Sequence, residues 1–194
     1  MDRSHELCVR PLVVALLAVA AWALAGGAAR AGIVDEVKGG VLAHDVGFLG
    51  HHVEGGADIV GEVLFKSPDF LSIIGSPRPT IGGSVNTDGR TDYGYFDMTW
   101  TGTVWRPGLR DGDGVYVGGF LGGAVHDGKI TGPSEQDGNK NLGTRALYHL
   151  GLMVGYHINP VYSVEIYFSH LSNADASSHN PGLNNLGLRA GFKF

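Results

Sequence analysis

The last part of the chain, residues 161–194, alternates strictly between apolar residues and polar or small ones. Neighbouring side chains of a β-strand point to opposite faces, so this alternation predicts strands that are apolar on one face only. Two such segments, 161–172 and 183–194, flank a polar loop and predict a β-hairpin that ends on Phe194. Its apolar faces comprise Tyr162, Val164, Ile166 and Phe168 on the first segment and Leu186, Leu188, Ala190, Phe192 and Phe194 on the second.

Similar segments recur from residue 39 onward, and clusters of Gly, Pro, Asn and Asp separate them. Segments of about ten alternating residues are typical of transmembrane β-barrels, in which eight is the smallest usual number of strands. Helix signals are nearly absent, apart from a short amphipathic entry segment expected at 32–40. The sequence therefore predicts an all-β fold, an eight-stranded antiparallel transmembrane β-barrel. Its expected strands are 39–51, 56–66, 78–88, 92–105, 114–126, 143–158, 161–172 and 183–194.

Small and aromatic residues also suit a narrow membrane barrel. Gly118, Gly122 and Gly151 fall on positions that are expected to face the crowded interior. Aromatic belts at the two membrane–water interfaces are expected from Trp100, Trp105, Tyr148, Tyr156 and Tyr162.

The first 31 residues have the features of a secretory signal peptide. An apolar run covers residues 12–25, and Ala29 and Ala31 supply the small residues of an A-x-A cleavage site. We expect cleavage after Ala31, which leaves residues 32–194 as one barrel domain; an uncleaved anchor helix is the alternative. The one cysteine, Cys8, lies in the leader. The barrel is therefore expected to fold without disulfides although it enters an oxidising compartment.

The charge of the chain and its last residue restrict its possible partners and its cellular location. The formal net charge is −5, which argues against a nucleic-acid partner. After the leader, no apolar run approaches the length of a transmembrane helix, so a membrane location requires a closed barrel. A soluble barrel would show the same alternation with its apolar faces inward. The leader and Phe194, which resembles an outer-membrane assembly signal, favour the bacterial outer membrane, with its lipids and its assembly machinery as partners.

A His and a Ser stand two residues apart at the end of the seventh segment. His170 and Ser172 share one face and are about 6.6 Å apart along a strand, so an imidazole that leans along the strand reaches the hydroxyl. With both termini on the periplasmic side, this end of the strand reaches the outer rim of the barrel. Asn184 has the lipid-facing parity of the next strand. The pattern predicts a nucleophile and its base; an ordinary polar rim beside a loop is the alternative.

The string His170-Leu171-Ser172-Asn173-Ala174 is similar to a motif of the lipid A 3-O-deacylases. That resemblance implies an eight-stranded outer-membrane acyl hydrolase with Ser172 as nucleophile and His170 as general base. It also implies that Asn173 contributes to the oxyanion hole. The match covers the last segment of the chain, and upstream only the strand pattern and the length agree.

One position departs from that family. That family has a turn of the D-G-I-E type, whose catalytic Glu stands twelve residues after the serine. Here the matching residues, 181–184, are Pro-Gly-Leu-Asn. Asn184 therefore stands at the position of the acid and is expected to orient the imidazole through a hydrogen bond, without a charge. Asp175 in the loop and Glu165 on the opposite strand face are the alternatives.

The Ser–His pattern predicts a serine esterase, and the resemblance implies that it removes the 3-O-linked hydroxyacyl chain of lipid A and so remodels lipopolysaccharide. A small structural or adhesion barrel without chemistry, and a phospholipase that uses the same Ser–His site, are the alternatives. The sequence leaves open whether the barrel forms a homodimer.

We expect neither a cofactor nor a metal. The pair His51-His52 together with His44 suggests metal ligands, but adjacent strand residues face opposite ways and no Cys or carboxylate spacing completes a site. Glu165 and Arg189 have inward parities on neighbouring strands, so we expect them to form an ion pair inside the barrel.

Overall fold

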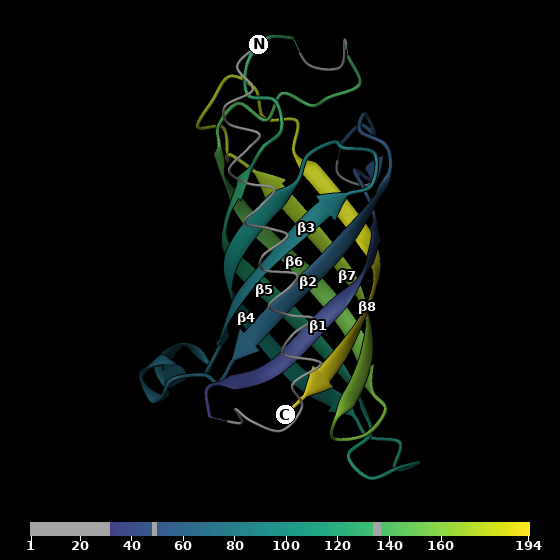
Figure 1. Cartoon of the computed structure of the whole chain (residues 1–194). Helices are drawn as coiled ribbons and strands as arrows, with labels where there is room; N and C mark the ends of the chain where they lie inside the picture. The colour runs from purple at the N-terminus through teal and green to yellow at the C-terminus, as the bar shows by residue number, and fades with distance from the viewer. Residues whose placement is uncertain (1–31, 48–49, 134–136) are drawn as a thin grey trace.

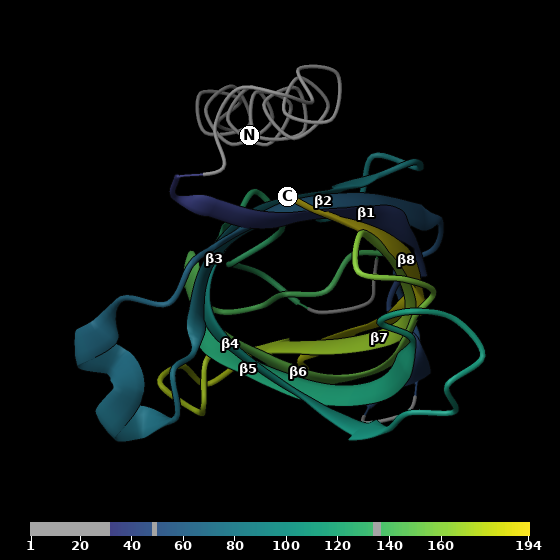
Figure 2. The same cartoon turned by 90° about the horizontal axis from the view of Figure 1, so that it is seen from below.

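The computed structural model describes residues 32–47, 50–133 and 137–194. Its strands form a closed barrel in which each strand pairs with its sequence neighbours and β1 pairs with β8 (Figures 1 and 2). All of these pairings are antiparallel, so the predicted eight-stranded antiparallel barrel is confirmed. The predicted leader lies outside the described residues. The strands are β1 (Val34–Ala43), β2 (Ala57–Phe65), β3 (Arg78–Asn86), β4 (Tyr93–Trp105), β5 (Gly114–His126), β6 (Ala146–His157), β7 (Tyr162–Ser172) and β8 (Leu183–Lys193).

The outer wall of the barrel is apolar and the lumen is polar. Leu152 and Leu188, for example, are each 67% exposed on the outside, whereas inward residues of the same sheet carry charges. A soluble barrel would have the opposite arrangement, because its apolar faces would point inward, away from water. The outer wall is instead suited to lipid, in which every backbone hydrogen bond must be made within the protein.

The lumen contains a charge-balanced set of side chains that join strands on both sides of the β1–β8 closure. Glu165 of β7 accepts hydrogen bonds from Lys38 Nζ of β1 at 2.7 Å and from Tyr116 Oη of β5 at 2.6 Å. Arg189 Nε of β8 donates to Glu165 Oε1 at 2.7 Å, and Arg189 Nη1 lies 2.8 Å from Glu62 Oε2 of β2. The predicted ion pair between Glu165 and Arg189 is therefore confirmed. We call these five residues the lumenal network.

Little room remains in the interior beside the larger side chains. A Cβ at Gly151, which faces inward on β6, would lie 2.0 Å from the carbonyl oxygen of Phe168 and 2.4 Å from the ring of Phe120. Glycine at this position therefore lets an aromatic ring lie across the strand.

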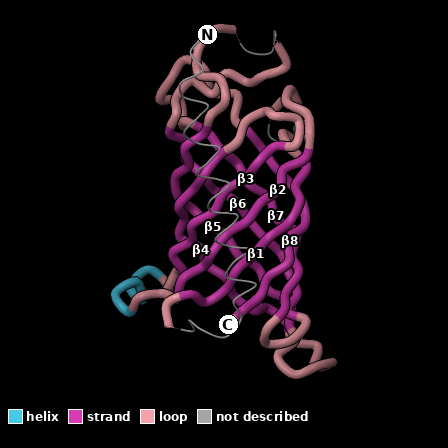
Figure 3. The backbone as a smooth tube through the Cα atoms, in the orientation of Figure 1, coloured by secondary structure: helices cyan, strands magenta, loops and turns pink. Residues whose placement is uncertain are grey.

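The two rims of the barrel differ in their connections. The terminal rim, where β1 begins and β8 ends, carries the connections 66–77, 106–113 and 158–161. The opposite rim, here called the loop rim, carries the connections 44–56, 87–92, 127–145 and 173–182. Figure 3 shows the longer loops gathered at the loop rim and one short helical segment at the terminal rim.

Two predictions about local structure were wrong. The first strand is β1, Val34–Ala43, and not 39–51, and the expected entry segment at 32–40 is mostly part of it. Charged residues obscured this strand, because Glu36 and Lys38 face the packed lumen and are buried there. The strand ends before Asp45, whose φ of 51° turns the chain. The connection 66–77 also contains an unpredicted 3₁₀ helix, η2 (Asp69–Ile74).

Within residues 32–47, 50–133 and 137–194, no helix is both long enough and apolar enough to cross a bilayer.

Removing the arginine of the lumenal network should weaken the barrel severely. Arg189→Met leaves two carboxylates of the lumenal network, Glu165 and Glu62, with Lys38 as their one cation, so that one negative charge is uncompensated. Breaking such a buried pair costs about 3–5 kcal/mol of unfolding free energy. Lys193→Met is the matched control, because Lys193 is 48% exposed and lies 3.7 Å from Asp35; an exposed pair contributes about 0–1 kcal/mol. Denaturant unfolding in detergent micelles measures both variants. Equal losses in the two would contradict a structural role for the network.

Candidate active site

The three polar side chains that the sequence placed on one lipid-facing surface are all at the loop rim, where His170 contacts Asn184 and Ser172 lies two residues from His170 on the same strand. His170 and Ser172 lie at the C-terminal end of β7, and Asn184 is the second residue of β8. The register pairs His170 directly with Asn184 and pairs Ser172 with Tyr148 of β6. All three share the parity of the exposed residues Ile166 and Leu186, so the predicted common face is present.

A hydrogen bond joins the imidazole to the amide across the strand pair. His170 Nδ1 lies 2.6 Å from Asn184 Oδ1. Because an amide oxygen only accepts, Nδ1 carries the proton, and in the neutral ring Nε2 is then the basic nitrogen. The predicted contact between His170 and Asn184 is therefore present, and it leaves the nitrogen that a general base needs unprotonated.

Asn184 faces outward on the wall, yet it is completely buried, because the connection between β1 and β2 covers it. The backbone N–H of Val46 donates to the carbonyl oxygen of Asn184 at 2.7 Å. A Cβ at Gly50 would lie 3.8 Å from Asn184 Nδ2. The loop thus shields the His170–Asn184 hydrogen bond, which strengthens it. Periodicity within the hairpin contained no signal for this cover, since the loop lies far away in the sequence.

Gly182 shapes the other side of the imidazole. Its φ is 66°, a left-handed conformation that favours glycine. A Cβ at this position would lie 2.8 Å from His170 Cε1. The glycine therefore serves both the turn into β8 and the close approach of the backbone to the imidazole. The Pro-Gly pair at 181–182 indicated a turn, but not this contact.

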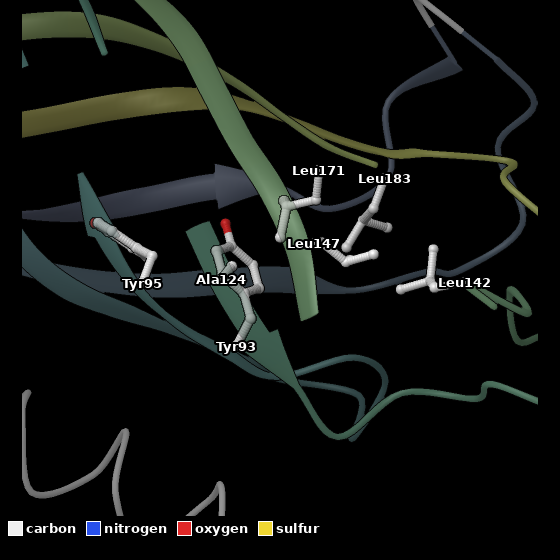
Figure 4. Packing of buried hydrophobic residues seen from close by; sticks show 7 residues of the cluster. All are labelled: Tyr93, Tyr95, Ala124, Leu142, Leu147, Leu171 and Leu183. Atoms are coloured by element: carbon white, nitrogen blue, oxygen red, sulfur yellow. The ribbon is translucent and has the colours of Figure 1, made fainter. Parts of the chain in front are cut away.

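A cluster of buried apolar residues lies on the lumenal side of the site (Figure 4). Leu171 lies between His170 and Ser172 in the sequence, and Leu183 directly precedes Asn184. The two leucines are paired across β7 and β8, and both point inward. Leu142 of the β5–β6 connection packs with them. The side of the site toward the barrel interior is therefore lined by buried apolar side chains.

A second group of buried charges, here called the rim cluster, ties three connections together. It consists of His44, Asp45, Glu54, Asp58 and Lys140. Lys140 Nζ contacts Asp45 Oδ1 at 2.5 Å and donates to the carbonyl oxygen of Gly182 at 2.9 Å. His44 Nε2 lies 3.0 Å from Glu54 Oε2, and its Nδ1 lies 2.8 Å from Asp58 Oδ1. The sequence contained no pattern that joined Lys140 to the site, because the contact comes from the meeting of distant loops.

The two alternatives for the third residue lie elsewhere. Glu165 belongs to the lumenal network, on the other side of the wall from His170. Asp175 Oδ1 accepts a hydrogen bond from Asn180 Nδ2 at 3.0 Å within the β7–β8 loop. Asn184 is therefore the residue that contacts the imidazole.

Asn173, predicted to contribute to an oxyanion hole, is buried in the base of the same loop. Its side-chain amide donates to the carbonyl oxygens of Leu142 at 2.9 Å and His179 at 2.6 Å. Its backbone N–H donates to Asn180 Oδ1 at 3.0 Å. Each N–H of Asn173 is thus occupied, and a donor for an oxyanion becomes available only when one of these bonds is exchanged.

Two of the three histidines considered as metal ligands, His44 and His52, have other partners. His44 belongs to the rim cluster, and His52 Nδ1 donates to the carbonyl oxygen of Asp45 at 2.7 Å. In the part of the chain that the structure describes, no group of three or more His, Cys, Asp or Glu side chains is arranged to hold a metal ion.

The apolar outer wall, the polar lumen and the closed eight-stranded topology together define a small β-barrel protein of the outer membrane. Comparison with known proteins carries the identification further. The profile of the family described as lipid A 3-O-deacylase (PagL) matches residues 81–193, more than half of the chain. This chain belongs to that family of outer-membrane enzymes.

The crystal structure of a member of this family agrees with the fold. The crystal structure of the outer membrane enzyme PagL is similar with a TM-score of 0.60 and 16% sequence identity, over 82% of this chain and 99% of that chain. The N-terminal beta-barrel domain of Pseudomonas aeruginosa OprF has a TM-score of 0.47 and 12% identity, over 84% and 100% of the two chains. No curated protein sequence matches the chain significantly.

The rim cluster should make the barrel sensitive to alkaline pH. Burial disfavours the imidazolium, but hydrogen bonds to Asp58 and Glu54 and their charges outweigh it and raise the pKa of His44 from 6.5 to about 9. A raised folded-state pKa contributes stability that is complete below the ordinary pKa and is lost as the pH rises through the folded one. We therefore expect the unfolding temperature in detergent to fall as the pH rises through about 9.

The matched variant for this test is His44→Gln, which removes the titrating group. Thermal unfolding of both proteins across the neutral to alkaline range separates His44 from the lysines and tyrosines, which titrate in both. A parallel decline in the parent and in His44→Gln would show that other groups cause the sensitivity.

Proposed function

We propose that this lipid A deacylase is a serine esterase that removes the 3-O-linked hydroxyacyl chain, with Ser172 as nucleophile and His170 as general base. The observation that carries the proposal is the His170–Asn184 hydrogen bond on the lipid-facing wall, two residues from Ser172. An ester of a membrane lipid reaches this surface without leaving the bilayer.

In the proposed reaction, His170 Nε2 takes the proton of the Ser172 hydroxyl as Oγ attacks the ester carbonyl. As the ester C–O bond breaks, the imidazolium gives that proton to the departing sugar oxygen, which leaves as a hydroxyl, and an acyl-enzyme remains on Ser172. Water, deprotonated by the same imidazole, attacks this ester and releases the hydroxy acid and free Ser172. Asn184 holds the ring in the tautomer that both steps need.

For the oxyanion, we propose the backbone N–H of Asn173. It follows the nucleophile directly in the chain, and its present acceptor is the side chain of Asn180 in the same loop. A negatively charged oxygen is a stronger acceptor than a neutral amide. The exchange requires a local rearrangement of the β7–β8 loop.

The orientation in the membrane is also part of the proposal. Outer-membrane barrels have short periplasmic turns and longer extracellular loops, which places the loop rim, and with it the site, at the outer leaflet. We further propose cleavage of the leader after Ala31 and recognition of Phe194 by the outer-membrane assembly machinery.

Replacement of either proposed catalytic residue should abolish deacylation while the barrel still forms. Ser172→Ala and His170→Ala are each expected to lower the rate on the order of 10⁴-fold or more, as in other serine hydrolases. Ser178→Ala, in the exposed part of the same loop, is the control and should retain parental activity. Mass spectrometry of purified lipid A measures the released hydroxy acid, and heat-modifiable gel mobility verifies folding.

Phospholipid added to the same reaction tests the phospholipase alternative directly. Near-parental activity in a folded Ser172→Ala variant would refute the proposed nucleophile. Cleavage of phospholipid with intact lipid A would refute the proposed substrate and leave the site in place.

Asn184 gives a separate test of the third role. Asn184→Asp keeps the acceptor in place and adds a charge that stabilises the imidazolium, so the rate should be retained or raised. Asn184→Ala removes the acceptor and should reduce kcat, but by less than Ser172→Ala does. Kinetics of the refolded variants decide between these outcomes. A silent Asn184→Ala together with an inactive Asp175→Ala would move the role into the loop.

A further inference from the structure

A short helical segment projects from the barrel at the rim opposite the site. η2 lies in the connection between β2 and β3, at the terminal rim. Seen along the barrel in Figure 2, it lies outside the ring of strands, beside β3 and β4. Neither the proposed chemistry nor the barrel closure uses it.

The segment has distinct polar and apolar edges. In a 3₁₀ helix, residues three apart lie above one another. Phe70 and Ile73 therefore share one edge, and they are 72% and 88% exposed. Asp69 and Ser72 share a second edge and are also exposed. Leu71, on the third edge, is buried. Two large apolar side chains exposed on one edge, beside a polar edge, are suited to a boundary between an apolar and a polar environment.

The segment is attached to the lipid-facing wall. Trp100 Nε1 donates to the carbonyl oxygen of Ile74 at 2.8 Å. A Cβ at Gly75 would lie 3.5 Å from the Trp100 ring. Trp100 shares its outward parity on β4 with Phe96 and Val104, which are 49% and 60% exposed. The anchoring point therefore belongs to the surface that faces the acyl chains.

Other aromatic residues indicate a membrane–water boundary at this rim. Trp105 and Tyr162 are 62% and 52% exposed near strand ends at the terminal rim, and the Phe192 ring packs edge-on against Tyr162 and Phe194. Trp and Tyr concentrate where acyl chains meet headgroups. η2 is thus attached within or beside this boundary.

We propose that η2 is a lateral membrane anchor, in which Phe70 and Ile73 insert into the phospholipid leaflet at the terminal rim. Asp69 and Ser72 remain among the headgroups and water. Lipid is the occupant that the geometry favours, because the apolar edge continues the lipid-facing wall through Trp100 and lies next to a polar edge. A segment that docks a protein partner would not have to adjoin the lipid-facing wall. The proposal is independent of the chemistry at the loop rim.

Labelled cysteine variants of the full chain test this placement. In a Cys8→Ser background, Ile73→Cys and Ser72→Cys place an environment-sensitive nitrobenzoxadiazole label on the apolar and the polar edge of the same turn. Leu152→Cys, on the outer wall, is the reference for lipid contact. Each folded variant is reconstituted into phosphatidylcholine vesicles with brominated acyl chains, or into unbrominated vesicles prepared in iodide.

The label at 73 should be quenched by brominated lipid at least about twofold more than the label at 72, since apolar faces of interfacial segments lie about 5–10 Å deep. Iodide should show the opposite order, and position 152 should resemble 73. Iodide quenching at 73 equal to that at 72 would place η2 in water and overturn the proposal. Protection of 73 from both quenchers would also overturn it, in favour of a protein occupant. Phe70→Cys, on the same apolar edge, replaces Ile73→Cys if that variant does not fold.

Discussion

The pairing of β1 with β8 is the constraint on which the rest of the molecule depends. It closes the sheet, so that the strands have no open edge, and lipid supplies no partners for an unpaired backbone. Closure with eight strands leaves a narrow interior that side chains must fill. Because the lipid-facing outer wall consists of apolar residues, the charged residues of the strands face the interior. These are tolerable there only as compensated pairs, and the lumenal network provides that compensation by setting Lys38 and Arg189 against Glu165 and Glu62.

Closure also determines what each rim can do. At the loop rim, long connections fold inward and over the wall, where the rim cluster holds them. Through Lys140, the cluster reaches the carbonyl oxygen of Gly182, whose backbone lies against the His170 ring. At the terminal rim, η2 extends sideways and is attached to Trp100 on the wall. The two ends of one barrel are thus specialised in opposite ways, one around a polar site and one around an apolar edge.

Asn184 illustrates how a polar group is accommodated on a lipid-facing wall. Its side chain has an outward parity, yet the loop from β1 covers it and its oxygen bonds His170. A polar side chain open to acyl chains would have no partner and would destabilise the wall. The cover therefore supports the barrel and the geometry of the imidazole at the same time. Membership of the lipid A 3-O-deacylase family gives this arrangement its functional context.

Much of the fold was predictable because alternation is a local property. β5 was predicted within its observed bounds, and the common face of His170, Ser172 and Asn184 followed from parity alone. β1 was misplaced because its inward residues, Glu36 and Lys38, are charged and the expected contrast between faces was missing. η2 was missed because six residues after a proline provide too little periodicity to recognise a helix.

The sequence by itself determined which residues share a face of a strand, since side chains alternate along any β-strand whatever its partners are. The tertiary structure decided which residues meet across strands and loops. The pairing of His170 with Asn184 depends on the register of β7 and β8, the burial of Asn184 depends on a loop more than a hundred residues away, and the occupied N–H groups of Asn173 depend on how the loop folds. Such contacts join distant parts of the chain and arise only when the barrel has closed.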